Sequence, residues 1–212
     1  MMWVPPKDWQ DQDAYLIGGG SSLKQFNFKL LVGQNTIGIN DAYLLGTDVV
    51  KYCMFGDASW WFKNSAKLAG FQNPIVTCAP SLEAIQSKKV LSLQRKSKGL
   101  YDGGTVGWNF CTGASAINLA INLGARRIHL LGFDMRAVNG KTHWHALRTS
   151  PTREAVFERF YRGFEFVAQS LCRFPSVEVI HVNDDETLLP FFKHMSTHAM
   201  NEQLAAQQME IA

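Results

Sequence analysis

Small and polar residues follow nearly every short apolar segment of this chain. If those segments are parallel strands, the residues after them lie at the carboxyl ends of a sheet, where open α/β proteins bind their ligands. Helix starts in such proteins can also face the ligand. The candidate nucleotide-binding residues at these positions are Gly18, Gly19, Gly20, Ser21, Ser22, Asn40, Asp41, Asp57, Thr112, Gly113, Ser115 and Asp134.

The run of glycines at 18–20 has the clearest chemistry. Glycine permits left-handed backbone angles and close backbone approach, and the N–H groups that follow it can surround phosphate oxygens. The run is not a P-loop, because no Gly-Lys-Ser/Thr follows it, and Leu23 replaces the third glycine of a dinucleotide fingerprint. Asp41 still stands about where such a fingerprint has its ribose-binding acid. An ordinary tight turn is the alternative interpretation.

A second phosphate-binding candidate is the start of the helix expected over residues 113–123. A helix N-terminus presents free N–H groups and a partial positive charge, and Thr112 is a residue type suited to the N-cap. The alternative is a plain capped helix that packs closely through small residues.

Two histidines flank a tryptophan in the polar connection after Asp134, in the order His143, Trp144, His145. Alternate residues of a loop can point to the same side, so both imidazoles can reach one ligand or one metal ion. Either can also act as a general base near neutral pH. A surface loop with two ordinary histidines is the alternative.

The remaining pattern predicts the elements that position these residues. Short apolar, β-branched segments predict strands at 14–17, 36–39, 49–55, 74–78, 89–93, 127–131 and 177–182, and helices are expected over 58–69, 113–123 and 151–172. Such alternation predicts an α/β class, as a Rossmann-like three-layer sandwich around a mostly parallel sheet. Residues 1–192 are expected to form a single nucleotide-binding domain, and residues 193–212 a helical or flexible tail. Trp60 and Trp61 are expected in the core or stacked on a base or sugar.

The composition narrows the class of protein further. The 212 residues are 46% hydrophobic and 12% aromatic, which excludes disorder for most of the length, and a net charge of +3 gives no strong nucleic-acid signal. The four cysteines form no C-x-x-C pair, and neither a signal peptide nor an apolar window of about 18 residues is evident. We expect a cytoplasmic protein without a membrane span, and a homo-oligomer is compatible with this fold.

Several of these motifs resemble those of a known family. The segment 18–23 is similar to the G-x-G-P-S-L turn of bacterial lipooligosaccharide sialyltransferases and of the archaeal hydroxymethylpterin pyrophosphokinase-like family, which includes many uncharacterised bacterial and phage proteins. Ser21 replaces the usual proline. The block from Cys111 through Gly124 to Asp134 resembles the T-S-G, L-G and G-x-D stretch of the sialyltransferases at equal spacing. Asn40 matches their asparagine after the second strand, and residues 183–191 are similar to their C-terminal motif.

The resemblance implies a Rossmann-like fold and transfer from an activated nucleotide donor, which is a CMP-sugar in the sialyltransferases. It implies that His143 or His145 deprotonates the acceptor. The connection before these histidines is shorter than the sialyltransferase lid, and the lid tyrosines that help bind the donor phosphate are not evident. The residues that it assigns to the donor site are Gly18, Gly20, Ser22, Asn40, Thr112 and Gly113.

The function favoured at this point is sialyltransferase-like glycosyl transfer from a nucleotide-sugar donor to an unknown acceptor, with no metal ion required. One alternative is pyrophosphoryl transfer from ATP, with Mg²⁺ held by Asp57 and Asp134. Another is a nucleotide-binding or assembly protein without catalysis.

Overall fold

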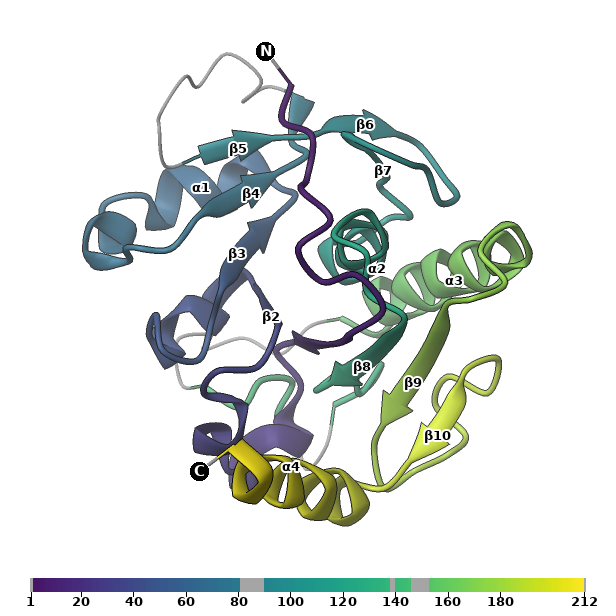
Figure 1. The fold of residues 1–212 in the computed structure, drawn as a ribbon. Coiled ribbons are helices and arrows are strands. Elements are labelled where there is room, and N and C mark those ends of the chain that lie inside the picture. The colour runs from purple at the N-terminus through teal and green to yellow at the C-terminus, as the bar shows by residue number, and fades with distance from the viewer. Residues whose placement is uncertain (1, 81–89, 138–139, 146–152, 212) are drawn as a thin grey trace.

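A computed structural model of the protein describes residues 2–80, 90–137, 140–145 and 153–211. Eight strands form one sheet in the order β10-β9-β8-β1-β2-β3-β4-β5, and each neighbouring pair in it is parallel (Figure 1). The strands are β1 Asp13–Ile17, β2 Thr36–Ile39, β3 Tyr52–Phe55, β4 Ile75–Thr77, β5 Val90–Ser92, β8 Arg127–Leu131, β9 Glu178–Val182 and β10 Lys193–Met195. The predicted α/β class with a mostly parallel sheet is confirmed.

The strand order creates a crevice at one place. The chain adds β2 to β5 in succession on one side of β1, then returns to place β8, β9 and β10 on the other side. The strand order therefore reverses between β1 and β8, which is called the switch point of the sheet. The connections after these two strands run in opposite directions, and the space between them can hold a ligand.

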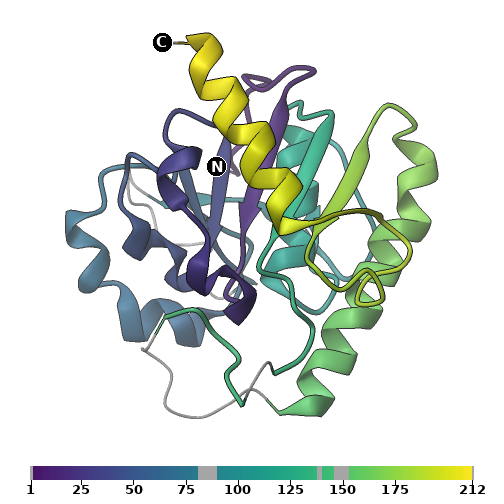
Figure 2. The same ribbon diagram turned by 90° about the horizontal axis from the view of Figure 1, so that it is seen from below.

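Helices cover both faces of the sheet (Figures 1 and 2). Side chains alternate along each strand, so Leu16 of β1 enters the core beneath α2 and α3, whereas Tyr15 and Ile17 enter the core on the other face. The α-helices are α1 Ala58–Asn64, α2 Thr112–Asn122, α3 Glu154–Ser170 and α4 Thr197–Ile211. The 3₁₀ helices are η1 Ser21–Gln25, η2 Phe28–Leu31, η3 Asn40–Leu45, η4 Lys67–Gly70 and η6 Leu171–Arg173.

The seven strands predicted from sequence are present; those at 36–39 and 127–131 have the predicted bounds, and the other five have shifted ends. Strand β3 begins at Tyr52 rather than residue 49, because Thr36 Oγ1 donates to the Val49 carbonyl at 2.5 Å and accepts from the Lys51 N–H at 2.9 Å. This pair of bonds holds residues 49–51 in a turn. Helix α3 begins at Glu154, and the predicted positions 89, 151 and 152 lie outside the described residues.

A small parallel pair, β6 Gln94–Lys96 and β7 Thr105–Gly107, was not predicted. Buried Asn118 of α2 holds the segment around β7: its Oδ1 accepts from the N–H groups of Tyr101 at 2.9 Å and Gly107 at 3.0 Å. The irregular backbone that packs on α2 has N–H groups that need acceptors, which explains the asparagine inside this otherwise apolar helix.

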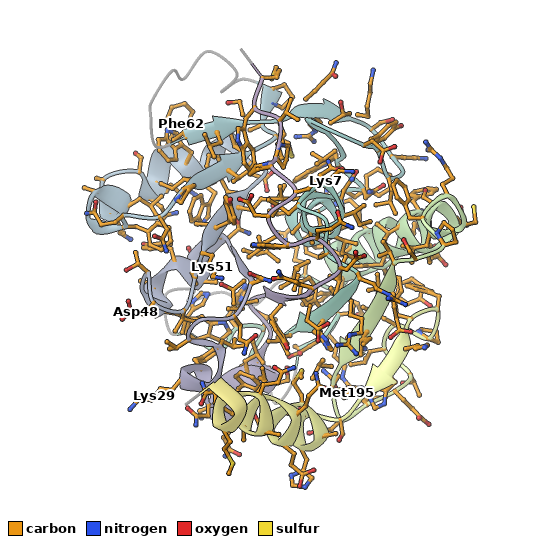
Figure 3. The ribbon with its side chains drawn as sticks, viewed as in Figure 1. Lys7, Lys29, Asp48, Lys51, Phe62 and Met195 are labelled. Atoms are coloured by element: carbon orange, nitrogen blue, oxygen red, sulfur yellow. The ribbon has the colours of Figure 1, made fainter. Side chains whose placement is uncertain are left out.

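The aromatic residues of α1 divide between core and solvent. Trp60 is buried, and Trp61 stacks on Phe55 at 5.3 Å between ring centroids. Phe62 points away from the sheet and is 72% exposed (Figure 3). The expectation that at least one of the two tryptophans packs in the core is confirmed, because Trp60 is buried and Trp61 is half-buried.

The segment after Phe192 continues the fold. Strand β10 pairs with β9, and α4 crosses the sheet face that carries Tyr15. Met200 and Leu204 of α4 are fully buried, and the Tyr15 hydroxyl donates to Gln207 Oε1 at 3.2 Å. Within the described ranges, none of the helices combines the length and the apolar character needed to cross a bilayer.

Candidate nucleotide site at the switch point

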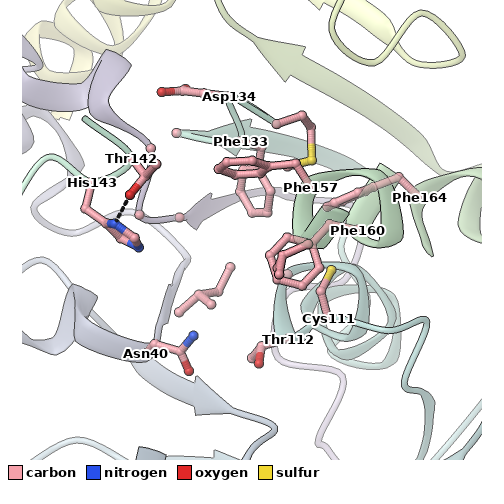
Figure 4. A pocket seen from close by; sticks show the side chains of 18 of the residues that line it. Asn40, Cys111, Thr112, Phe133, Asp134, Thr142, His143, Phe157, Phe160 and Phe164 are labelled. Carbon is pink, nitrogen blue, oxygen red and sulfur yellow. Dashed lines mark hydrogen bonds between the residues drawn. The ribbon is translucent and has the colours of Figure 1, made fainter. Parts of the chain in front are cut away.

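A cavity of about 240 Å³ opens at the carboxyl ends of β1, β2, β3 and β8, at the switch point of the sheet. Figure 4 shows its two unlike walls: polar groups from the strand ends, α2 and the histidine loop face a group of aromatic side chains from α3 and the end of β8. Of the predicted residues, those that line the cavity are Gly18, Gly19, Gly20, Asn40, Asp41, Asp57, Thr112, Gly113, Asp134, His143 and His145.

The glycine turn is required by close backbone approach. The segment after β8 runs alongside it, with Gly20 N–H donating to the Gly132 carbonyl at 2.8 Å. A Cβ atom on Gly18 would lie 2.6 Å from the Gly132 oxygen, and one on Gly20 would lie 2.5 Å from Oδ1 of Asp134. Left-handed φ angles, the other property that suggested glycine, are not used at 18–20.

Asp134 holds the glycine turn in place through hydrogen bonds. Its carboxylate accepts hydrogen bonds from Ser22 N at 2.9 Å, Ser22 Oγ at 2.5 Å, Ser21 Oγ at 3.4 Å and Asn183 Nδ2 at 3.3 Å. The carboxylate is buried and both of its oxygens are engaged, so its bonds connect the ends of β1, β8 and β9. Ser21 and Ser22 do not line the cavity: the Ser22 hydroxyl donates to Asp134, and the Ser21 hydroxyl lies near both Asp134 and the Lys141 carbonyl. Their assignment to the ligand stays a prediction.

Asp41 is held between two aromatic side chains. Trp60 Nε1 donates to Oδ1 of Asp41 at 2.9 Å, and Oδ2 lies 3.6 Å from Nε2 of His145. Both members of the Asp41–His145 pair are nearly buried, with side-chain exposures of 9% and 7%. The predicted ribose-binding acid therefore contacts a histidine of the distant loop, a pairing that no local sequence pattern indicates.

The loop that carries the histidines is fastened to the glycine turn by Trp144. Its indole N–H donates to the Gly18 carbonyl at 3.0 Å, and its backbone N–H donates to the Gly19 carbonyl at 2.9 Å. The rings of His143 and His145, on either side of Trp144, lie 5.2 Å apart at the cavity. The expectation that both imidazoles reach one space fits this geometry, and their roles remain predictions.

The start of α2 differs from its predicted form. Cys111 is the N-cap residue instead of Thr112, and its Sγ accepts from the Ala114 N–H at 3.3 Å. Burial raises the pKa of the Cys111 thiol to about 12, so the thiol stays protonated at neutral pH and does not act as a nucleophile. Thr112 and Gly113 line the cavity, where the first turn of α2 is favourable for an anion.

Ser115, a predicted ligand-binding residue, is hydrogen-bonded within the protein. Its hydroxyl donates to the carbonyls of Trp108 at 3.0 Å and Cys111 at 3.2 Å, so it secures the turn before α2 and does not line the cavity. Asp57, at the end of β3, lines the cavity and is exposed.

The sequence analysis missed the aromatic wall. Phe133, after β8, meets Phe164 of α3 edge to face at 5.7 Å, and Phe157 and Phe160 extend this wall along α3 (Figure 4). The sequence predicted a helix over 151–172, but nothing in that pattern distinguished cavity wall from core. Arg159 lies at the same end of the cavity.

Strained backbone is concentrated at this cavity. Of the non-glycine residues with left-handed φ in the described ranges, Asn40 (53°), Phe110 (63°) and Met135 (51°) line it, and Asn109 (46°) precedes Phe110. Such conformations cost energy and tend to gather at functional sites. At Asn40 the strain accompanies a buried Oδ1 that accepts no hydrogen bond from any described residue.

Asp134, one of the two carboxylates of the predicted magnesium site, already accepts four hydrogen bonds within the protein, two at each oxygen. A cation at Asp134 would have to displace at least one of them. The magnesium site stays a prediction.

Comparison with known proteins identifies the fold. No protein-family model matches the chain, and no curated protein matches it by sequence. A structure of the sialyltransferase CstII from Campylobacter jejuni, in complex with the substrate analogue cytidine-5'-monophosphate, matches with a TM-score of 0.57 and 13% identity, over 89% of this chain and 86% of that chain. A structure of CstII with CMP-3FNeuAc gives a TM-score of 0.46 at 13% identity, over 86% and 84% of the two chains. The first match shows that this chain has a sialyltransferase-like α/β fold.

Proposed function

We propose that this protein is a nucleotide-dependent glycosyltransferase of sialyltransferase-like form, which uses a CMP-sugar or related nucleotide-sugar donor. The main support for the proposal is the Asp41–His145 pair. Both residues line the same cavity as the glycine turn and the first turn of α2. A general base and an anion-binding surface are the two parts that metal-free glycosyl transfer requires of the protein. The CMP bound by CstII, whose fold is similar, supports a cytidine nucleotide as the first ligand to test.

The proposed transfer involves the acceptor hydroxyl, the anomeric carbon of the donor and one imidazole. The acceptor hydroxyl oxygen attacks the anomeric carbon of the donor, and its proton passes to the imidazole of His143 or His145. The bond from the anomeric carbon to the phosphate oxygen breaks, and the electron pair leaves with the nucleotide phosphate. Asn40, Thr112 and the turn at 18–20 are the proposed donor-binding groups.

Pyrophosphoryl transfer from ATP has less support, because Asp134 is engaged within the protein and the chemistry needs a carboxylate-bound Mg²⁺. A protein that binds nucleotide without catalysis would use the same cavity.

Thermal denaturation with CMP, UDP, GDP, ATP and CMP-sialic acid, each with and without Mg²⁺, separates these functions. A ligand at about 100 times its Kd adds about 2.7 kcal/mol, which raises Tm by roughly 5–10 °C in a protein of this size. We expect CMP compounds to stabilise the protein without metal, and CMP-sialic acid to release CMP on incubation. Stabilisation by ATP only in the presence of Mg²⁺ would contradict the proposal, and CMP-sialic acid binding without turnover would favour the non-catalytic function.

A further inference from the structure

The two histidines of the loop have different surroundings, which suggests different tasks. His145 lies against the buried carboxylate of Asp41, whereas His143 lies over Gly19. We propose that His143 binds the phosphate of the donor, donating a hydrogen bond from Nε2 to the leaving group, and that His145 is the base. This inference rests on the proposed function in requiring a nucleotide phosphate at the glycine turn.

The position of His143 is defined from two sides. A Cβ atom on Gly19 would lie 3.0 Å from Cδ2 and 3.6 Å from Nε2 of His143, so the Nε2 edge of the ring covers the middle of the glycine turn. On the opposite edge, Nδ1 lies 2.7 Å from the hydroxyl of Thr142. Figure 4 shows the ring directed into the cavity from the side of Thr142.

The direction of the hydrogen bond between Thr142 and Nδ1 decides the role of Nε2, and the proposal takes the Thr142 hydroxyl as the donor. When the Thr142 hydroxyl donates to Nδ1, the proton of a neutral imidazole resides on Nε2; when the imidazole is charged, both nitrogens carry protons. In both of these states an Nε2–H group lies beside the middle of the glycine turn. The N–H groups of Gly18 and Gly20 are bonded to the end of β8 and the segment after it, and that of Ser22 to Asp134, so a side-chain donor is the contact that we propose for the phosphate here. Trp144 holds the loop to that turn through two hydrogen bonds, so the donor is preorganised.

The two roles are compatible in one turnover. The acceptor proton moves to His145, the electron pair of the breaking bond stays on the phosphate oxygen, and the N–H of His143 stabilises that charge without transferring its proton.

Affinities for CMP and for cytidine, measured by titration calorimetry, test this division. We expect His143→Ala to weaken CMP about tenfold or more, the usual loss for a hydrogen bond to a charged group, and to change cytidine less than twofold. Thr142→Val is expected to weaken CMP by a smaller factor, because it releases Nδ1. His145→Ala and the control His198→Ala, on the exposed face of α4, should leave both affinities unchanged.

Unchanged CMP affinity in His143→Ala, or an equal loss for cytidine, would overturn the inference while leaving the proposed function standing. If the wild-type protein binds another nucleotide instead of CMP, the proposed donor is wrong, and the same comparison with that nucleotide and its nucleoside decides the role of His143. If no nucleotide binds, both proposals fail. Circular dichroism of each variant establishes that it is folded.

Discussion

The indole N–H of Trp60 donates to Asp41 at 2.9 Å and leaves the second carboxylate oxygen of Asp41 facing His145. A carboxylate that orients a histidine stabilises the imidazolium that forms when the histidine accepts a proton. Trp60, which was expected in the core, thus connects the core to the chemistry proposed for the site.

Removing the negative charge of Asp41 should slow transfer without weakening nucleotide binding. We expect Asp41→Asn to lower the rate of CMP release from CMP-sialic acid by at least tenfold, because the amide no longer stabilises an imidazolium at His145. Trp60→Phe, which keeps Asp41 but removes its donor, should lower the rate less and cost about 1–3 kcal/mol of stability. Equal rates for Asp41→Asn and wild type would remove Asp41 from the mechanism.

The base itself should affect turnover more strongly. His145→Ala is expected to reduce kcat by about 10²–10⁴-fold with CMP affinity retained, the range typical of a general base. Initial rates at saturating donor measure this, with His198→Ala as the exposed-histidine control. Loss of turnover in His143→Ala alone, with His145→Ala fully active, would reverse the assignment.

The three glycines of the turn should respond differently to alanine. At Gly20 a methyl group meets the carboxylate of Asp134 at 2.5 Å and a backbone oxygen at 2.6 Å, so Gly20→Ala should cost roughly 1–3 kcal/mol and several degrees of Tm. Gly19→Ala contacts the His143 ring at 3.0 Å, and we expect it to weaken CMP binding with a smaller effect on Tm. Gly70 has open space around it, so Gly70→Ala is the matched control.

A Gly20→Ala protein with the Tm of Gly70→Ala would show that the β8 segment can move away from the turn. The close packing of the two segments would then be dispensable.

Stability should fall on mild acidification because of His181. This residue is buried in β9, neither ring nitrogen has a hydrogen-bond partner among the described residues, and burial lowers its pKa to about 4. The unfolded chain, with a histidine pKa near 6.5, binds the proton more readily. The neutral imidazole therefore makes its full contribution to the free energy of unfolding above about pH 6.5. As the pH falls toward 4, the free energy of unfolding decreases by up to about 3 kcal/mol.

Urea unfolding between pH 4 and pH 7 measures this loss, and His181→Leu should flatten the dependence in that window. A variant with the same slope as wild type would assign the acid sensitivity to other groups.

The fold could be predicted because its signals are local. Short apolar segments that end in glycine, asparagine or aspartate indicate buried parallel strands. Gly124, two residues after the end of the helix before β8, has a left-handed φ of 99°. The same local signals predicted that Gly18, Asn40 and Thr112 lie near one another, because the carboxyl ends of parallel strands meet at one edge of a sheet. All three residues line the cavity.

Only the tertiary structure decided what each polar group contacts. Ser22 and Asp134 are 112 positions apart and satisfy each other, and Asp41 meets Trp60 and His145 from separate elements. Hydrogen bonds of this kind depend on side-chain distances of about 3 Å, whereas a hydrophobic pattern specifies only which face of an element is buried. The sequence by itself therefore determined the layers and the edge where the site lies, and the packing of distant segments determined which residues face the ligand and which brace the turn.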